Sequence, residues 1–237
     1  GHWLPGSLGH DRKNIGLLVR LFFETYKNKP NPPALILKTS MVTSSILDRN
    51  KILSNIEKIK NDVKGTLPNV YLLHGDLTDE EMNELYNNSK VKAMISLTKG
   101  EGFGRPLLEF SLVNKPIIAS AWSGQIDFLD RELSILVGGE LKPLHKSSVQ
   151  EEVLVEGSSW FFPYDNHAMA AMKEVQKNYD KYRVNAKKLG YKNRTNFSFE
   201  KMKEALNEIL TNHVPVFPKQ IELMLPKLNL PKLEKID

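Results

Sequence analysis

The sequence contains no cysteine, and this absence removes two classes of structure at once. A chain without cysteine has no disulfide framework and no cysteine-ligated zinc site. It fits a reducing compartment, and we therefore expect a cytoplasmic protein. The first residues, 1–5, also lack the basic start and apolar stretch of a secretory signal peptide, so no signal peptide is predicted.

Long hydrophobic runs are missing as well, and no stretch approaches the roughly 20 apolar residues that a membrane-spanning helix needs. Hydrophobic residues make up 41% and charged residues 26% of the 237 residues, an ordinary balance for a globular protein. We expect one main domain, residues 1–212. The Pro- and Lys-rich tail, residues 213–237, contains prolines that exclude a continuous helix. We interpret it as an extended or disordered tail, with an ordered binding arm as the alternative.

Blocks of a single charge sign are also absent. The formal net charge of +5 favours anionic ligands, but Lys and Arg are interspersed with Asp and Glu. This pattern argues against a nucleic-acid partner. It suits a phosphorylated small molecule and, equally, an anionic membrane surface, so peripheral membrane contact stays open.

What the sequence does contain is a regular alternation of strand and helix patterns. Apolar residues recur at helical spacing over residues 15–26, 46–63, 78–86, 106–113, 165–182, 184–196 and 199–210, and short apolar runs typical of buried strands cover 34–38, 70–73, 91–97, 116–119 and 134–137. Thr78 and Glu81 form a predicted capping box. Residues 138–163 are expected to be irregular, with 153–155 as a candidate strand. The alternation predicts an α/β fold, with a single Rossmann-like, doubly wound parallel sheet and closing C-terminal helices.

A glycine-rich turn follows the predicted strand that ends at Leu97. Its sequence, from Lys99 to Glu109, is Lys-Gly-Glu-Gly-Phe-Gly-Arg-Pro-Leu-Leu-Glu. The glycines allow backbone N–H groups to approach a phosphate closely, and Pro106 suits the first turn of a helix, where its missing donor is not needed. Because the positive end of that helix would face the ligand, the turn predicts a diphosphate-binding site.

Two carboxylates frame this turn. Glu109 is placed to accept hydrogen bonds from two neighbouring ribose hydroxyls. Glu101 would lie beside the sugar, near its hydroxyls and the positive charge that develops at the anomeric carbon. Taken singly, each carboxylate is more often a solvated surface charge, so the pattern and not the single residue supports the prediction.

The segment from Glu101 to Glu109 resembles the Glu-x7-Glu signature of retaining GT-B glycosyltransferases of the group 1 type. Residues 114–120 and 77–89 are similar to the strand after and the helix before that motif in the family. The likeness extends over residues 1 to about 210. It implies the donor-binding, C-terminal half of an enzyme that transfers a hexose from a UDP- or GDP-sugar to an acceptor with retention of configuration.

The resemblance also implies roles for individual residues. The catalytic residue would be Glu101. The donor-binding residues would be Lys13, Arg12, Thr39, His74, Gly75, Gly102, Phe103, Gly104, Arg105 and Glu109. This chain departs from the family at two of the relevant positions, since His2 stands where an arginine is common and Arg105 replaces an apolar residue. Asp127 is interpreted as structural, and the aromatic run at 160–162 as packing.

No Asp-x-Asp motif occurs anywhere in the chain, although that motif holds the metal ion in the other large glycosyltransferase fold. We therefore expect no metal and no cofactor besides the donor substrate, so that cationic side chains and a helix N-terminus neutralise the leaving diphosphate. The resemblance further implies that the half that contacts a glycan, lipid or protein acceptor is missing from this chain. We expect the chain alone to bind donor but to transfer sugar poorly.

The sequence admits one other interpretation and disfavours a second. A noncatalytic nucleotide-sugar-binding or interaction domain that kept the half-fold stays open. A dinucleotide oxidoreductase is disfavoured, because the glycines at 100, 102 and 104 lack the G-x-G-x-x-G spacing. The next predicted strand also ends at 119–120 without an acid for a ribose.

Overall fold

The computed structural model describes residues 2–3, 9–149, 154–155 and 157–215. The chain divides into two compact units, Gly1–Ser198 and Phe199–Asp237. All of the predicted site residues belong to the first unit. Most of the predicted tail lies outside the described residues, so the division into a domain of residues 1–212 and a tail stays a prediction.

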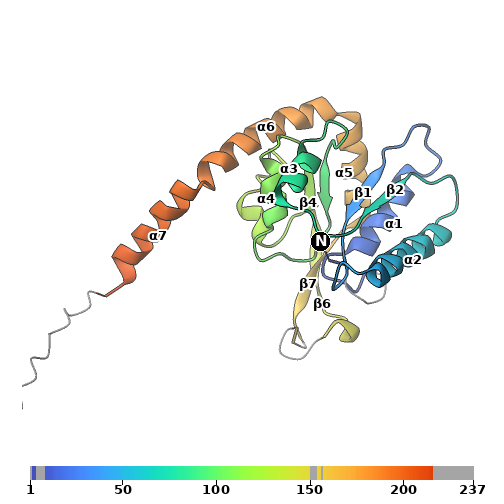
Figure 1. Ribbon diagram of the computed structural model, residues 1–237, viewed down its shortest axis with the longest axis horizontal. Helices are drawn as coiled ribbons and strands as arrows, with labels where there is room; N and C mark the ends of the chain where they lie inside the picture. Colours follow the sequence, from blue (N-terminus) through green and yellow to red (C-terminus); the bar gives the residue numbers. More distant parts are fainter. Residues whose placement is uncertain (1, 4–8, 150–153, 156, 216–237) are drawn as a thin grey trace, which may run out of the picture. The chain divides into compact units, whose positions relative to one another are not determined.

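Strands and α-helices alternate from residue 15 to residue 120, as the sequence predicts (Figure 1). In chain order the strands and α-helices of the first unit are α1 (Ile15–Tyr26), β1 (Leu35–Lys38), α2 (Ile46–Asp62), β2 (Val70–Leu73), α3 (Asp79–Asn87), β3 (Met94–Ser96), α4 (Arg105–Ser111), β4 (Ile117–Ser120), β5 (Ile135–Val137), β6 (Gly139–Pro143), β7 (Ser159–Pro163), α5 (Asp165–Lys177) and α6 (Tyr179–Asn196). Short 3-10 helices cover Gly124–Asp127 and Lys146–Ser148. The described part of the second unit contains α7 (Phe199–His213).

The strands that carry the site are parallel. β1 pairs with β2 in one sheet, and β4 lies between β3 and β5 in another, so the described residues form two parallel sheets where the sequence predicts a single one. Along β4, Ile118 joins one hydrophobic cluster, whereas its neighbours Ile117 and Ala119 join another. Since successive side chains of a strand point to opposite faces, both faces of this sheet are buried, and the predicted parallel α/β fold is confirmed.

Each face has its own helices. α1 packs against α2 and α5, and α4 packs against α6. The capping box predicted for α3 is present, because the Thr78 hydroxyl accepts from the Glu81 amide at 3.2 Å and the Glu81 carboxylate accepts from the Thr78 amide at 2.8 Å. The break between the last two helices of this unit comes at Asn178, several residues earlier than predicted. The Asn178 side chain donates to Glu174 of the preceding helix, and its backbone leaves the helical region there.

The sequence prediction was wrong for residues 138–163. β6 and β7 form an antiparallel pair that runs from Gly139 opposite Pro163 to Pro143 opposite Ser159. Figure 1 shows the two strands side by side, leading away from the parallel strands. The candidate strand at 153–155 includes residue 153, which lies outside the described residues. The predicted packing role of the aromatic run is confirmed for Trp160 and Phe161, which are buried.

Candidate functional site

The site is built where the loop before α1 meets the turn after β3. The amide of Lys99 donates to the carbonyl of Arg12 at 2.9 Å, and the Thr98 hydroxyl donates to the same oxygen at 3.4 Å. The Arg12 guanidinium in turn donates to the carbonyl of Gly100. Two segments far apart in the sequence are thus joined through their backbones at the carboxyl end of β3, the edge at which ligands of open α/β sheets bind.

Glu101 is the centre of this junction. Its carboxylate forms an ion pair with the ammonium group of Lys13, and its other oxygen lies 3.4 Å from Arg12 Nη1. The Glu101 side chain is only 12% exposed. Burial raises the pKa of Glu101, but the hydrogen bond and charge of Lys13, with the charge of Arg12, outweigh burial and hold that pKa below its ordinary value. The carboxylate is therefore ionised at neutral pH.

The loop after β4 fixes the backbone of Glu101. The Ser123 hydroxyl accepts from the Glu101 amide at 3.0 Å and donates to the Glu101 carbonyl, which also accepts from the Gly124 amide at 3.1 Å. A side chain at Gly124 could not fit, because its Cβ would lie 2.1 Å from the carbonyl oxygen of Gly102. These contacts were not predicted, because their one signal in the sequence is the Ser-Gly pair, which is typical of turns.

Two buried charges lie beneath the junction, and neither was predicted. The Asp11 carboxylate accepts from the Ile15 amide at 3.1 Å and so caps α1, while burial raises the pKa of Asp11. Lys99 is 1% exposed and donates to the carbonyl of Gly9. Burial lowers the pKa of Lys99 to about 8, against the opposing charge of Asp11.

The helix after the glycine-rich turn begins as predicted. Gly104 is the N-cap of α4 with a φ of 89°, a left-handed conformation that favours glycine, and Pro106 lies in the first turn. Arg105 and Glu109 form an ion pair of 2.7 Å along the helix, with exposed fractions of 76% and 41%. Glu109 is therefore at the surface and engaged by a neighbour. Phe103 is exposed on one side and packs against Phe128 on the other.

A second set of predicted residues lies at the ends of β1 and β2. His74 Nδ1 is 3.3 Å from the carbonyl oxygen of Thr39, and Nε2 is 3.1 Å from that of Ser45 at the start of α2. Gly75, at a φ of 109°, has open space where a Cβ would be, and its carbonyl accepts from Lys38. The imidazole of His74 thus lies between the end of β1 and the start of α2, within hydrogen-bonding distance of a backbone oxygen on each side.

The structure therefore places the predicted residues in three sets. Arg12 and Lys13 both contact the carboxylate of Glu101 directly. Thr39, His74 and Gly75 lie together at the neighbouring strand ends. Gly102, Phe103, Gly104, Arg105 and Glu109 form the turn and the start of α4.

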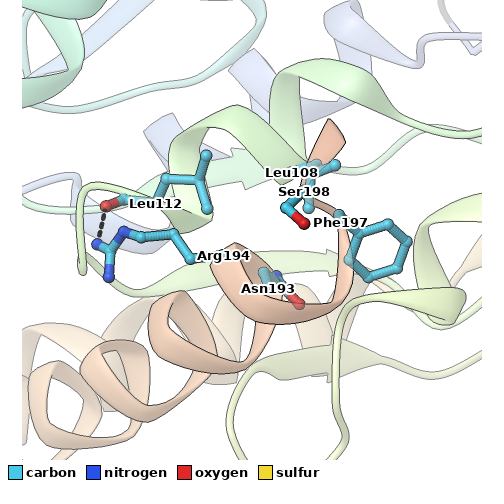
Figure 2. Close-up of a pocket in the computed structure, with 6 residues that line it drawn as sticks. All are labelled: Leu108, Leu112, Asn193, Arg194, Phe197 and Ser198. Carbon is cyan, nitrogen blue, oxygen red and sulfur yellow. Dashed lines mark hydrogen bonds between the residues drawn. The ribbon is translucent and has the colours of Figure 1, made fainter. Parts of the chain in front are cut away.

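Two hollows in the described part of the first unit do not coincide with these sets. One, with a volume of about 230 Å³, lies between α4 and α6 and is lined by residues that include Leu108, Asn193 and Arg194 (Figure 2). Arg194 donates across it to the carbonyl of Leu112 at 2.6 Å. Another, of about 560 Å³, is lined partly by Asp127. Charge and hydrogen bonding, and not these hollows, locate the candidate site.

Two negative findings concern only the part of the chain that the structure describes. No helix there is both long and apolar enough to cross a membrane. No cluster of three or more histidine, aspartate or glutamate side chains there is arranged to hold a metal ion.

No protein-family model matches the chain, and no curated protein matches it in sequence. Its structure is similar to that of HepE from Anabaena in complex with UDP and glucose, with a TM-score of 0.59 and 13% identity over 85% of this chain and 45% of that one. Sucrose-phosphate synthase from Thermosynechococcus elongatus gives a TM-score of 0.58 and 17% identity over 88% of this chain and 44% of its own. The chain thus spans less than half the length of either protein.

A third similar structure is an isolated domain. The C-terminal domain of a glycosyl transferase group 1 family protein, LpcC from Francisella tularensis, matches with a TM-score of 0.50 and 15% identity over 78% of both chains. The chain matches less than half of each of the two long proteins and most of an isolated C-terminal domain, so the three comparisons indicate the same part of the fold. The chain has the fold of the C-terminal half of a GT-B glycosyltransferase.

Proposed function

We propose that this chain is the donor-binding half of a retaining glycosyltransferase, which transfers a hexose from a UDP- or GDP-sugar to an acceptor. The observation that carries the proposal is the cluster in which Lys13 and Arg12 meet the carboxylate of Glu101 at the end of β3. Cations suited to a diphosphate and an ionised acid suited to a sugar lie there side by side. The binding of UDP and glucose by HepE, which shares the fold, supports the same assignment.

Donor binding would exchange partners within this cluster. A diphosphate competes for Lys13 and Arg12, because phosphate oxygens accept charge-assisted hydrogen bonds as a carboxylate does. Glu101 then turns part of its hydrogen-bonding capacity to the sugar hydroxyls. In the free chain Lys13 and Arg12 hold the pKa of Glu101 below its ordinary value, so the donor meets an ionised carboxylate, which can stabilise positive charge at the anomeric carbon.

The ribose is assigned to Glu109. Its present partner, Arg105, is an exposed neighbour one helical turn away, and such pairs contribute only about 0.3–0.5 kcal/mol. Ribose hydroxyls can therefore replace Arg105 on the carboxylate at little cost. The released guanidinium is then free to approach the diphosphate, which leaves without the help of a metal ion in this proposal.

The base is assigned to the set at the ends of β1 and β2. Gly75 offers backbone beside open space, and Thr39 and His74 form the adjoining edge. The acceptor, a glycan, lipid or protein, would be held mainly by the other half of the enzyme. For that reason the chain by itself is expected to bind donor without efficient transfer.

The test is a thermal-unfolding panel with UDP, GDP, ADP and their sugars. We expect one nucleotide class to raise the unfolding midpoint, since a ligand at about 100 times its Kd adds about 2.7 kcal/mol to the free energy of unfolding. Lys13→Met should abolish the shift. The control is Lys27→Met, which removes a surface partner of Glu24 at the end of α1 and should leave the shift unchanged.

No shift with any nucleotide would contradict the proposal, and an undiminished shift in Lys13→Met would contradict the diphosphate contact. The catalytic role needs the complete two-domain protein. If Glu101→Ala transferred sugar there as fast as the wild type, the noncatalytic alternative would be favoured.

A further inference from the structure

Trp122, in the loop after β4, has an indole ring that is covered on one side and open to solvent elsewhere. The ring lies nearly parallel to that of Phe161, with an interplanar angle of 8° and 6.0 Å between centroids, yet Trp122 is 41% exposed. The other two tryptophans of the chain, Trp3 and Trp160, are buried. A large aromatic surface at this place therefore needs an explanation.

The ring is held close to the candidate catalytic residue. Ser123 and Gly124, the next two residues, bind the backbone amide and carbonyl of Glu101. Gly124 packs so tightly on Gly102 that no side chain fits between them. The loop that carries Trp122 is thus fixed to the turn that carries Glu101.

The covered side of the ring is braced by a second element. Phe161 lies on β7, and its amide donates to the carbonyl of Lys99 at 3.1 Å. Both ends of the stack are therefore anchored to the segment that leads into Glu101. A ring held in this way loses little conformational freedom when a ligand covers it, which favours binding.

The chemistry of the open face suits a sugar. A pyranose ring presents C–H groups of slight positive charge on one face, and an aromatic face is negative at its centre, so the two attract and exclude water. The hydroxyls at the pyranose edge need polar partners nearby. The Glu101 carboxylate supplies acceptors of that kind.

We propose that the exposed face of Trp122 is a stacking platform for a pyranose ring bound beside Glu101. The inference rests on the proposed function, because it takes the Glu101 side of the site to be the sugar side. The pyranose has two candidate sources, the hexose of the donor and a saccharide acceptor. An apolar surface of the other half of the enzyme is the competing occupant.

The experiment compares the wild-type chain with Trp122→Ala and Trp122→Phe by calorimetric titration. The ligands are UDP, UDP-glucose, GDP, GDP-mannose and the methyl glycosides of glucose and mannose. Tyr191→Ala removes an aromatic side chain that is 73% exposed on α6, and it serves as the matched control. Tryptophan emission gives a second readout, because Trp122 is the exposed tryptophan.

A donor hexose on the platform predicts that the nucleotide sugar binds the wild type more tightly than the nucleotide alone. Trp122→Ala should lose roughly three- to tenfold in affinity for the nucleotide sugar and nothing for the nucleotide. An acceptor saccharide predicts instead that the methyl glycoside binds the wild type in the calorimetric titration and changes its emission, and that Trp122→Ala loses most of the binding heat. In either case Trp122→Phe, which keeps an aromatic face but not the fluorophore, should retain most of the affinity measured by calorimetry. This variant is decisive if the alanine variant does not fold.

The proposal is overturned if no sugar changes the emission and if both Trp122 variants bind every ligand as the wild type does. If nucleotides still bind in that case, the proposed function is retained, and the exposed face of Trp122 is assigned to contact with the other half of the enzyme. If no nucleotide binds even to the wild type, the proposed function fails. The titration with methyl glycosides then tests the stacking platform independently, and the absence of binding overturns the platform proposal.

Discussion

Lys99 shows how a buried ammonium group, which is unfavourable for folding, is accommodated next to the candidate site. Burying an ammonium group is unfavourable unless charge and hydrogen-bonding partners replace water. Here the carbonyl of Gly9 accepts from it, and the rings of Trp160 and Phe162 lie with their centroids 4.9 and 4.3 Å from Nζ. These partners do not fully replace water, because the pKa of Lys99 is still lowered to about 8.

This lowered pKa predicts a pH dependence of stability with a definite sign. Between about pH 8 and the ordinary lysine value of 10.5, the unfolded chain keeps the proton that the folded chain has lost, so the contribution of Lys99 to stability rises with pH. We expect the free energy of unfolding of the wild type, relative to Lys99→Met, to rise by roughly 1 kcal/mol per pH unit from pH 8 to 10. Urea unfolding of both proteins at several pH values measures the difference.

Other groups do not obscure that measurement. Burial raises the pKa values of Tyr26 and Tyr86 to about 12. The unfolded chain loses these protons first, so the free energy of unfolding falls as the pH passes 10, and it falls equally in both proteins. A difference that stays flat across the range would show that the ammonium group keeps its proton in the folded protein. The ring faces and Gly9 would then replace water more completely than the lowered pKa indicates.

Elements whose signals are local could be predicted from the sequence, and elements that depend on distant partners could not. α3 could be predicted from Thr78 and Glu81, because the contacts of these residues lie within one helical turn. β6 has no such signal, because Gly139–Pro143 is mostly polar and ends in proline. It becomes a strand only by pairing with β7 across a long connection.

The same distinction holds for the candidate site. The turn from Glu101 to Glu109 was predicted because its residues are close in sequence and their spacing is informative. The contact between Lys13 and Glu101 was not, since it depends on a loop that crosses to the end of β3. Ser123 was missed for the same reason, as its hydroxyl becomes important only when the loop after β4 meets that turn.

The packing of α4 against α6 can be tested at one glycine. A Cβ at Gly190 would lie 2.3 Å from the side-chain oxygen of Asn114 and 2.7 Å from the carbonyl of Ser111. Alanine favours a helix by about 1 kcal/mol over glycine, but overpacking costs about 1–3 kcal/mol and needs the two helices to separate. We expect Gly190→Ala to lower the free energy of urea unfolding and, because α4 carries Glu109, to weaken donor binding.

Lys187→Ala is the control for that variant, because it introduces alanine at an exposed position of α6. It should change the free energy of unfolding by less than about 0.5 kcal/mol. A Gly190→Ala protein as stable as the wild type would mean that the two helices adjust without cost. The tight contact would then not determine where α4 lies.

At the scale of the whole molecule, both hydrophobic clusters of the residues that the structure describes lie in one unit. Every buried residue of the two clusters belongs to Gly1–Ser198. α7, in the second unit, buries none of its residues, and its apolar side chains, such as Met202 and Ile209, are exposed. Since burial of apolar surface is the main favourable contribution to folding, the first unit contains what it needs to fold.

A chain that ends at Ser198 should therefore have the same free energy of unfolding in urea as the full chain. A difference of less than about 0.5 kcal/mol is expected for a change outside the core. Its affinity for the donor nucleotide should also be unchanged, because the three sets of candidate site residues all precede that point. Circular dichroism and nucleotide titration of the two chains, side by side, make the comparison. A lower midpoint in the shorter chain would show that residues after Ser198 stabilise the first unit, and a weaker affinity at an equal midpoint would show that they contribute to the donor site itself.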